Sequence, residues 1–261
     1  MKKNLYLLIV AFLLILTSCE KEEIGNITDN NTFPVITDID RQINHFFDLA
    51  THDNVTHNVT GEKLRLEPRR HRGEVKIYLD SSVTPQEKQI IDNQIDLVLT
   101  YIEGSGVSFV YTNDIDSFDI GIVSGSPEYM NSVFGTNSNP PDYWFGGVTG
   151  WSSCRTIQKR YMWFDPEHSK GKTIRHELMH TIGLKHAESG NSLMYHNLGQ
   201  ADDFLSPNDV VALKLLYYDG VYGSISPVET DNCSDDETYM YPNEEEELKE
   251  KIRLIIENDF N

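Results

Sequence analysis

The chain has 261 residues, of which 39% are hydrophobic and 24% charged, which suits one globular domain with polar extensions. Its formal net charge of -19 argues against a nucleic-acid partner, because the phosphates would be repelled. Residues 229–261 hold 12 acidic and 3 basic side chains and so account for 9 of the excess negative charges, which leaves the rest of the surface less acidic.

The first 18 residues predict an export signal. Two lysines give a positive start, and the apolar core Leu5–Leu16 is too short for a comfortable membrane span. It ends in Leu16-Thr17-Ser18-Cys19, which resembles the lipobox of bacterial lipoproteins. The resemblance implies cleavage before Cys19, a lipid on that cysteine, and anchorage in the bacterial cell envelope at the outer membrane. An uncleaved anchor or a plain signal peptide is the alternative.

Residues 19–71 lack a sustained apolar pattern, so we expect a flexible tether or a pro-segment. The acidic run at 20–23 either looks like the surface-export signal of some Gram-negative lipoproteins or is a solvated charge cluster. Ile39 to Leu49 could form a short helix. We expect four histidines here to be solvated loop residues: His45, His52, His57 and His71.

Regular structure is expected from about residue 74. Val75–Leu79 alternates between apolar and polar residues and predicts a strand. Thr84 and Pro85 predict a helix start, after which apolar side chains recur at spacings of three and four until two glycines end the helix. Two further strands are expected, at 107–111 and 120–123.

The next stretch, residues 124–153, is rich in Gly, Pro, Asn and aromatic residues and predicts a long loop. Arg160–Asp165 follows it and is expected to be an edge strand of the sheet. His168 comes just after this strand, and we expect its side chain to be exposed.

The most informative stretch is His176-Glu177-Leu178-Met179-His180-Thr181-Ile182-Gly183-Leu184-Lys185-His186. His176 and His180 are four apart, so on a helix both imidazoles can reach one metal ion. Gly183 can take the left-handed backbone that ends a helix, which could return His186 as a third ligand. Three neutral imidazoles leave one position open for water, the arrangement of a catalytic zinc. Glu177 would take a proton from that water, which the metal acidifies for attack on a carbonyl.

Downstream lies Ser192-Leu193-Met194-Tyr195, and the long histidine motif followed by such a methionine resembles the metzincin zinc peptidases, most of all the matrixins. The resemblance is tight over 176–195 and only architectural over about 75–220. It implies an α+β fold in which an α/β-type upper subdomain has a twisted mixed sheet and two long helices. A small lower subdomain then holds the Met-turn and a C-terminal helix, with zinc at the cleft.

The same resemblance implies roles for single residues. Met194 would form an apolar floor beneath the metal, and the edge strand would pair with an extended substrate through backbone hydrogen bonds. Some metzincins use a tyrosine two places after the methionine as an extra metal ligand. That place is His196 in this chain, so we expect Tyr195 in the wall of the specificity pocket and leave His196 without a role.

Two family features do not transfer. Matrixins often mask the zinc with a pro-segment cysteine, but this chain has no cysteine between Cys19 and Cys154. A carboxylate such as Asp48 or Asp53 could ligate zinc instead, although nothing in the sequence singles one out. The family's second, structural zinc needs histidines that are missing here between 111 and 166. Calcium could still bind through Asp and backbone carbonyls, at sites that the sequence does not place.

The C-terminal part of the chain begins with a predicted helix. Ser206-Pro207 predicts its start, and apolar residues continue almost to its end near residue 219, which places the catalytic domain at about 72–222. The acidic C-terminal extension, 223–261, contains a second helix that Asn243 could cap. Three apolar residues of that helix share one face and predict that it docks: Leu248, Ile252 and Ile255.

Two cysteines remain once Cys19 is lipidated. In an exported protein we expect Cys154 and Cys233 to form a disulfide, with two free thiols as the alternative.

The sequence therefore predicts a lipid-anchored, monomeric zinc endopeptidase that cleaves extracellular or surface polypeptides. His176, His180 and His186 would bind zinc, and Glu177 would act as general base and then as proton donor to the leaving amine. One alternative is a catalytically silent surface lipoprotein that serves as a binding module, against which the presence of Glu177 argues. Another is a zinc hydrolase that acts on a non-peptide amide. The preferred substrate is not set by the sequence.

Overall fold

The computed structural model of this chain divides it into two units, Met1–Pro34 and Val35–Asn261, and every described residue lies in the second. The signal peptide, Cys19, Cys154 and Cys233 lie outside the described residues, so the lipidation and the disulfide stay predictions. The described ranges are 38–56, 61–140, 145–153, 156–169, 171–188, 190–222 and 239–260.

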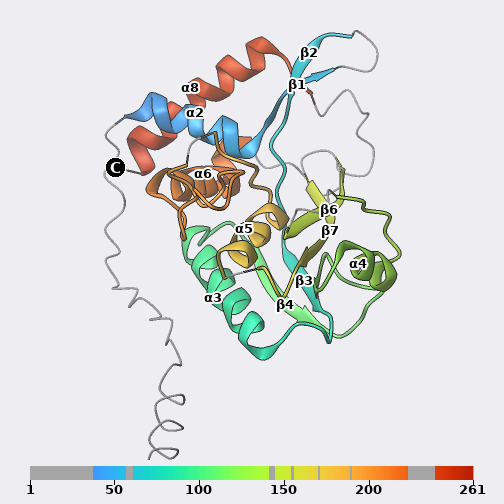
Figure 1. Cartoon of the computed structure of the whole chain (residues 1–261). Helices are drawn as coiled ribbons and strands as arrows, with labels where there is room; N and C mark the ends of the chain where they lie inside the picture. Colours follow the sequence, from blue (N-terminus) through green and yellow to red (C-terminus); the bar gives the residue numbers. More distant parts are fainter. Residues whose placement is uncertain are drawn as a thin grey trace, which may run out of the picture. The chain divides into compact units, whose positions relative to one another are not determined.

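A five-stranded sheet runs through this unit (Figure 1). Its strand order is β4-β3-β5-β7-β6, with parallel pairing throughout except between β7 and β6, which are antiparallel. The mixed sheet and its helices confirm the predicted α+β class. The strands are β3 (Glu74–Leu79), β4 (Ser108–Thr112), β5 (Ile120–Ser124), β6 (Gly146–Ser153) and β7 (Thr156–Phe164).

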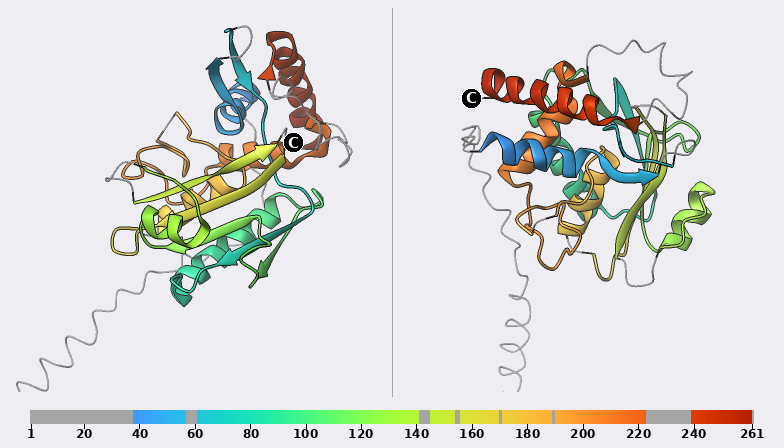
Figure 2. Two further views of the ribbon diagram at one scale, coloured as in Figure 1. Left: turned by 90° about the vertical axis from the view of Figure 1, so that its right-hand side faces the viewer. Right: turned by 90° about the horizontal axis from the view of Figure 1, so that it is seen from above.

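Helices cover both faces of this sheet (Figures 1 and 2). α3 (Pro85–Tyr101) and α5 (Gly171–Thr181) pack on one face, and α4 (Pro127–Phe134) packs on the other. α3 begins as predicted: Thr84 and Glu87 form a capping box, and Pro85 takes the first turn. The strands alternate their side chains between the two cores, so neighbouring residues such as Met162 and Trp163 lie in different hydrophobic clusters.

Two predictions for the segment before the motif are wrong. Residues 124–153 are not one long loop, because they contain α4 and β6. Arg160–Asp165 is not an edge strand either: residues 160–164 belong to β7, which lies between β5 and β6. The edge is β6, whose first two residues and fifth residue are glycines, a composition that does not favour a strand in sequence.

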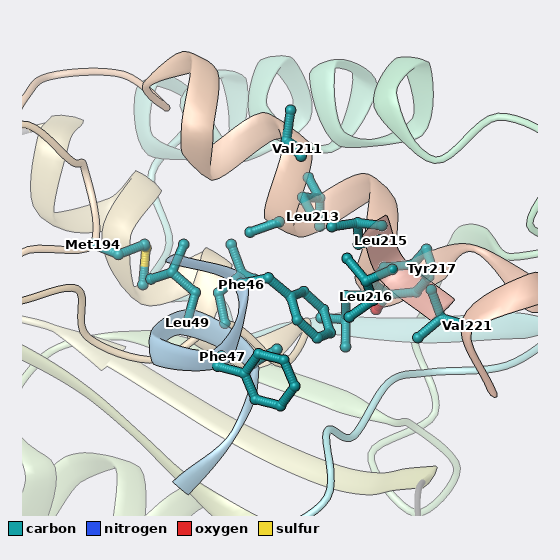
Figure 3. Close-up of a cluster of buried hydrophobic side chains, with 14 of the residues drawn as sticks. Phe46, Phe47, Leu49, Met194, Val211, Leu213, Leu215, Leu216, Tyr217 and Val221 are labelled. Carbon is teal, nitrogen blue, oxygen red and sulfur yellow. The ribbon is translucent and has the colours of Figure 1, made fainter. Parts of the chain in front are cut away.

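The helix α2 (Ile39–Ala50) is part of the core. It starts at Asp38, whose side chain caps the backbone N–H of Arg41, and it lies against α6 (Pro207–Tyr217). Figure 3 shows aromatic and aliphatic side chains of α2 packed beside those of α6. The short helix expected over Ile39 to Leu49 is therefore confirmed as α2, and these residues are not a flexible tether. The helix buries five apolar side chains: Ile43, Phe46, Phe47, Leu49 and Ala50. Whether residues 19–71 act as a pro-segment stays a prediction.

The C-terminal segment also packs on the core. α8 (Pro242–Asp259) buries Ile252, Ile255 and Ile256 and lies beside α2 and the short α7 (Asp219–Tyr222), as the docking prediction required (Figures 1 and 2). Its N-terminus differs from the prediction, because the capping position is Tyr241 rather than Asn243. A second, antiparallel sheet pairs N-terminal strands with a C-terminal one. Its order is β1 (His52–Thr56), β2 (Lys63–Leu66) and β8 (Tyr239–Met240).

Among the helices of the described ranges, none combines the length and the apolar character needed to cross a bilayer.

Candidate metal centre

Three histidines of the predicted motif come together at the end of α5. His176 and His180 lie one turn apart on this helix, which ends at Thr181. The chain then turns at Gly183, whose φ of +110° lies in the region that favours glycine, and His186 follows three residues later. A side chain at Gly183 would also lie only 2.3 Å from the backbone oxygen of Arg69. Both the positive φ and this lack of space therefore require glycine at the turn.

The nitrogen atoms of the three rings converge on one point. The Nε2 atom of His180 lies 3.0 Å from the Nε2 of His176 and 3.2 Å from the Nε2 of His186. Nitrogen atoms at these separations can bind one cation together, and the three side chains form a group that could hold a metal ion. His176 is buried, His180 is half-buried and His186 is exposed, so the site opens to solvent on the side of His186.

Hydrogen bonds orient the two helical imidazoles. The Nδ1 atom of His176 lies 2.7 Å from the backbone oxygen of Leu193, and that of His180 lies 2.7 Å from the backbone oxygen of Leu184. A carbonyl only accepts, so each Nδ1 donates a proton and each Nε2 keeps its lone pair for a metal. Burial lowers the pKa of His176 to about 4 and that of His180 well below its ordinary value, which keeps both rings neutral.

The loop that carries His186 is fixed on both sides. The backbone N–H of Lys185 donates to the backbone oxygen of Leu49, at the end of α2, with an N···O distance of 2.7 Å. The N–H of Ala187 donates to the backbone oxygen of Met194 over 2.8 Å. The third histidine is therefore held between the N-terminal helix and the turn that contains the methionine.

That turn is itself held by a buried carboxylate. The backbone N–H of Tyr195 donates to the oxygen of Ser192, which closes the turn around the fully buried Met194. The Ser192 hydroxyl donates to Oδ1 of Asp209 over 2.8 Å, and Nε2 of His45 lies 2.7 Å from the same oxygen. His45 comes from α2, so the prediction that it is a solvated loop residue is wrong.

Glu177 lies beside the histidines and is almost completely buried. Burial raises the pKa of its carboxyl to about 8. Gly146, the first residue of β6, makes room for it: a side chain at Gly146 would lie 2.9 Å from Cγ of Glu177 and 3.1 Å from its Oε1. The carboxyl group therefore lies between α5 and the start of the edge strand.

The histidines and Glu177 line one cleft of about 1430 Å³. One wall is the first part of β6, from Gly146 to Gly150, whose outer edge has no neighbouring strand in the described sheet. The other walls come from the end of α2, the loop that carries His186, and residues 196–199. Positively charged side chains also line the cleft: Arg65, Arg69, Arg160 and Lys185.

Other residues that the sequence singled out lie around this centre. His196 lines the cleft, with its ring centroid 6.5 Å from that of His186, but it is not a member of the three-histidine group. The ring of Tyr195 contacts that of His196, although Tyr195 is not among the residues that line the cleft. Asp48 lines the cleft without belonging to the group, and Asp53 is described only through its backbone in β1.

For the remaining histidines the sequence predicted exposed side chains, and the structure confirms this for one and contradicts it for another. His168 is exposed, as expected, and pairs with Asp165. His71 is buried instead of solvated, with its Nε2 2.9 Å from the backbone oxygen of Thr181, the last residue of α5. His52 is described only through its backbone in β1, and His57 lies outside the described residues.

No protein-family model matches this sequence, and no curated protein is similar enough to match it.

Proposed function

We propose that this chain is a zinc-dependent endopeptidase of metzincin type, similar to the matrixins. The observation that carries the proposal is the geometry of the three histidines, together with a buried glutamate next to the first of them. The motif from 176 to 186 and the turn around Met194 have the local structure that such a site requires.

The donor set fits zinc. A tetrahedral zinc ion with bonds of 2.0–2.1 Å to nitrogen separates its ligand atoms by about 3.3 Å. The two measured separations from the Nε2 of His180, 3.0 and 3.2 Å, are close to this value. Neutral nitrogen donors and an open fourth position are typical of a catalytic zinc, which would polarise the substrate carbonyl and acidify a water molecule.

Glu177 would act as the general base. Its carboxyl group is held beside His176, where it can accept a proton from the attacking water and deliver it to the nitrogen of the leaving amine. A carboxyl group that takes and returns a proton near neutral pH needs a pKa above the ordinary value, and burial raises it in that direction.

The edge strand β6 would bind the substrate. An extended peptide can add to an exposed strand edge through backbone hydrogen bonds, and the residues Gly146–Gly150 of β6 line the cleft beside Glu177. An open cleft along a strand edge favours a polypeptide over a small amide. With the predicted lipid on Cys19, the enzyme would act on extracellular or surface proteins from the bacterial cell envelope.

The test uses the soluble chain that begins at residue 20, so that α2 is retained. The zinc-loaded protein is incubated with a diverse peptide mixture beside Glu177→Ala, and products are identified by mass spectrometry. We expect cleavage by the wild-type chain, none by Glu177→Ala, and none after chelation. Bound zinc should remain near one equivalent in Glu177→Ala and be lost in His180→Ala.

Two results would contradict the proposal. Cleavage that persists in Glu177→Ala or after chelation would have another origin. A wild-type chain that holds zinc but cuts no peptide, and yet retains specific peptides on a column, would instead support the binding module.

A further inference from the structure

The end of α5 is closed partly by hydrogen bonds of its own turn. The last carbonyl oxygens of a helix have no partner within the helix, and a buried oxygen that stays unpaired destabilises the fold. Here the N–H of Leu184 donates to the oxygen of Met179 over 3.1 Å, and the N–H of Gly183 donates to that of His180 over 3.2 Å. The two oxygens that follow are paired by side chains from elsewhere in the chain.

A buried histidine pairs the first of these two oxygens. Nε2 of His71 lies 2.9 Å from the backbone oxygen of Thr181, and His71 is 2% exposed. A carbonyl only accepts, so Nε2 carries the proton. Burial lowers the pKa of His71 to about 4, so the ring brings no positive charge towards the metal centre. The segment before β3 that carries His71 is itself fixed, because the oxygen of Arg70 accepts a hydrogen bond from the N–H of Ile157 over 3.0 Å.

A buried tyrosine pairs the second oxygen. The hydroxyl of Tyr217, the last residue of α6, donates to the backbone oxygen of Ile182 over 2.8 Å. The same hydroxyl accepts from the backbone N–H of His71 over 3.5 Å. Tyr217 is 1% exposed and lies in the core that α6 shares with α2 (Figure 3). Two segments that are 146 positions apart in the sequence therefore converge on the end of α5.

This end of the helix leads directly to the candidate metal ligands. The oxygen of Leu184, two residues after Ile182, accepts the hydrogen bond from Nδ1 of His180 that leaves Nε2 of this ring free for a metal ion. His186 follows two residues later, and its Nε2 lies 3.2 Å from that of His180. A displacement of the chain at Ile182 would therefore move both the acceptor that orients His180 and the third histidine.

We propose that His71 and Tyr217 are positioning residues of the metal centre, which hold the end of α5 in the conformation that lets His180 and His186 bind the same ion. This inference rests on the zinc centre of the proposed function and adds the residues that shape it. Neither side chain lines the cleft, so each acts through the backbone oxygen to which it donates.

The experiment measures the affinity for zinc in the chain that begins at residue 20, by competition with a chromophoric chelator at neutral pH. Partners that orient metal ligands contribute about 10- to 100-fold to metal affinity, so His71→Leu and Tyr217→Phe should each raise the dissociation constant about tenfold or more. Tyr217→Phe removes one oxygen atom and keeps the ring, so the core packing is retained. His71→Gln should keep most of the affinity, because its amide can donate to Thr181 in place of Nε2.

A control variant separates position from stability. Met130 on α4 is fully buried in a hydrophobic cluster that contains no residue of α5, so Met130→Ala should destabilise the fold without changing the end of that helix. A chain that remains folded binds metal with an affinity that does not depend on its margin of stability, so the zinc affinity of Met130→Ala should equal that of the wild type. Urea unfolding of the metal-free variants measures the two losses of stability for comparison.

Cobalt(II) bound in place of zinc gives a second readout. Its visible absorption depends on the geometry of the ligands, and we expect the spectrum to change in His71→Leu and Tyr217→Phe. The spectrum should match the wild type in His71→Gln and in Met130→Ala.

The outcomes separate this inference from the peptidase proposal, because no substrate is needed. Unchanged zinc affinity and an unchanged cobalt spectrum in both His71→Leu and Tyr217→Phe would overturn the positioning role. An equal loss of affinity in Met130→Ala would overturn it as well, because stability alone would then explain the effect. If the variants behave as expected but the zinc-loaded wild type cuts no peptide, the positioning role stands and the peptidase proposal fails.

Discussion

The pair formed by His45 and Asp209 should stabilise the fold measurably, although the sequence predicts His45 to be solvated. Nε2 of His45 lies 2.7 Å from Oδ1 of Asp209, and the two side chains are 12% and 0% exposed. A hydrogen bond to a charged group contributes about 1.5–3 kcal/mol when both partners are shielded from water. We therefore expect His45→Ala to lower the free energy of unfolding by about 2 kcal/mol.

His168 provides the matched control. It makes a similar contact with Asp165, at 2.8 Å, but the two side chains are 55% and 31% exposed. Exposed pairs contribute about 0–1 kcal/mol, so His168→Ala should change the free energy of unfolding by less than 1 kcal/mol. Both variants are compared with the wild type by urea unfolding of the metal-free chain at pH 7 and low salt. Equal losses in the two variants would refute the reasoning, because burial would then not decide the strength of the pair.

Three further predictions test the surroundings of the candidate metal centre. Gly183→Ala should lower the free energy of unfolding by about 3 kcal/mol, because it combines a positive φ with a backbone clash. Gly135→Ala is the control: φ is +67° and the space is open, so the loss in urea unfolding should be about 1 kcal/mol. His71 has its pKa lowered by burial from 6.5 to about 4, so the unfolded chain binds the proton more tightly. Stability should therefore fall by up to about 3 kcal/mol as the pH drops from 6.5 to 4, and less in His71→Gln, as measured by denaturation at each pH. A chain that begins at residue 72 lacks α2 and should bind zinc more weakly and be digested faster by trypsin than the chain from residue 20; equal protection of both would contradict this.

The parts of the fold that the sequence predicted well carry strong local signals. The capping box at Thr84 and the Ser206-Pro207 start are set by side chains within three residues, so α3 and α6 were found near their observed bounds. The three-histidine group was found for the same reason: the spacing of His176, His180 and His186 corresponds to one helical turn followed by one glycine turn.

What could not be predicted depends on contacts distant in sequence. β6 has three glycines within its first five residues, and its strand conformation comes from pairing with β7 rather than from intrinsic preference. Arg69 and Arg160 are 91 positions apart in the sequence, and nothing in either local pattern indicates that both line one cleft. Arg69 precedes β3, and the bridge between Arg70 and Thr156 holds its segment beside the start of β7, the strand that carries Arg160.

The helix α2 shows why low overall hydrophobicity in a segment does not make it a tether. Its neighbours in sequence are polar, but its own apolar side chains lie on one face, and Phe46 and Leu49 have no exposed surface in the core that they share with α6 (Figure 3). Burying that face stabilises the helix far more than its intrinsic propensity could. The same helix also holds the loop that carries His186, because the backbone oxygen of Leu49 accepts a hydrogen bond from the N–H of Lys185. Because this contact fixes the residue next to His186, α2 contributes to the position of a histidine of the candidate metal centre.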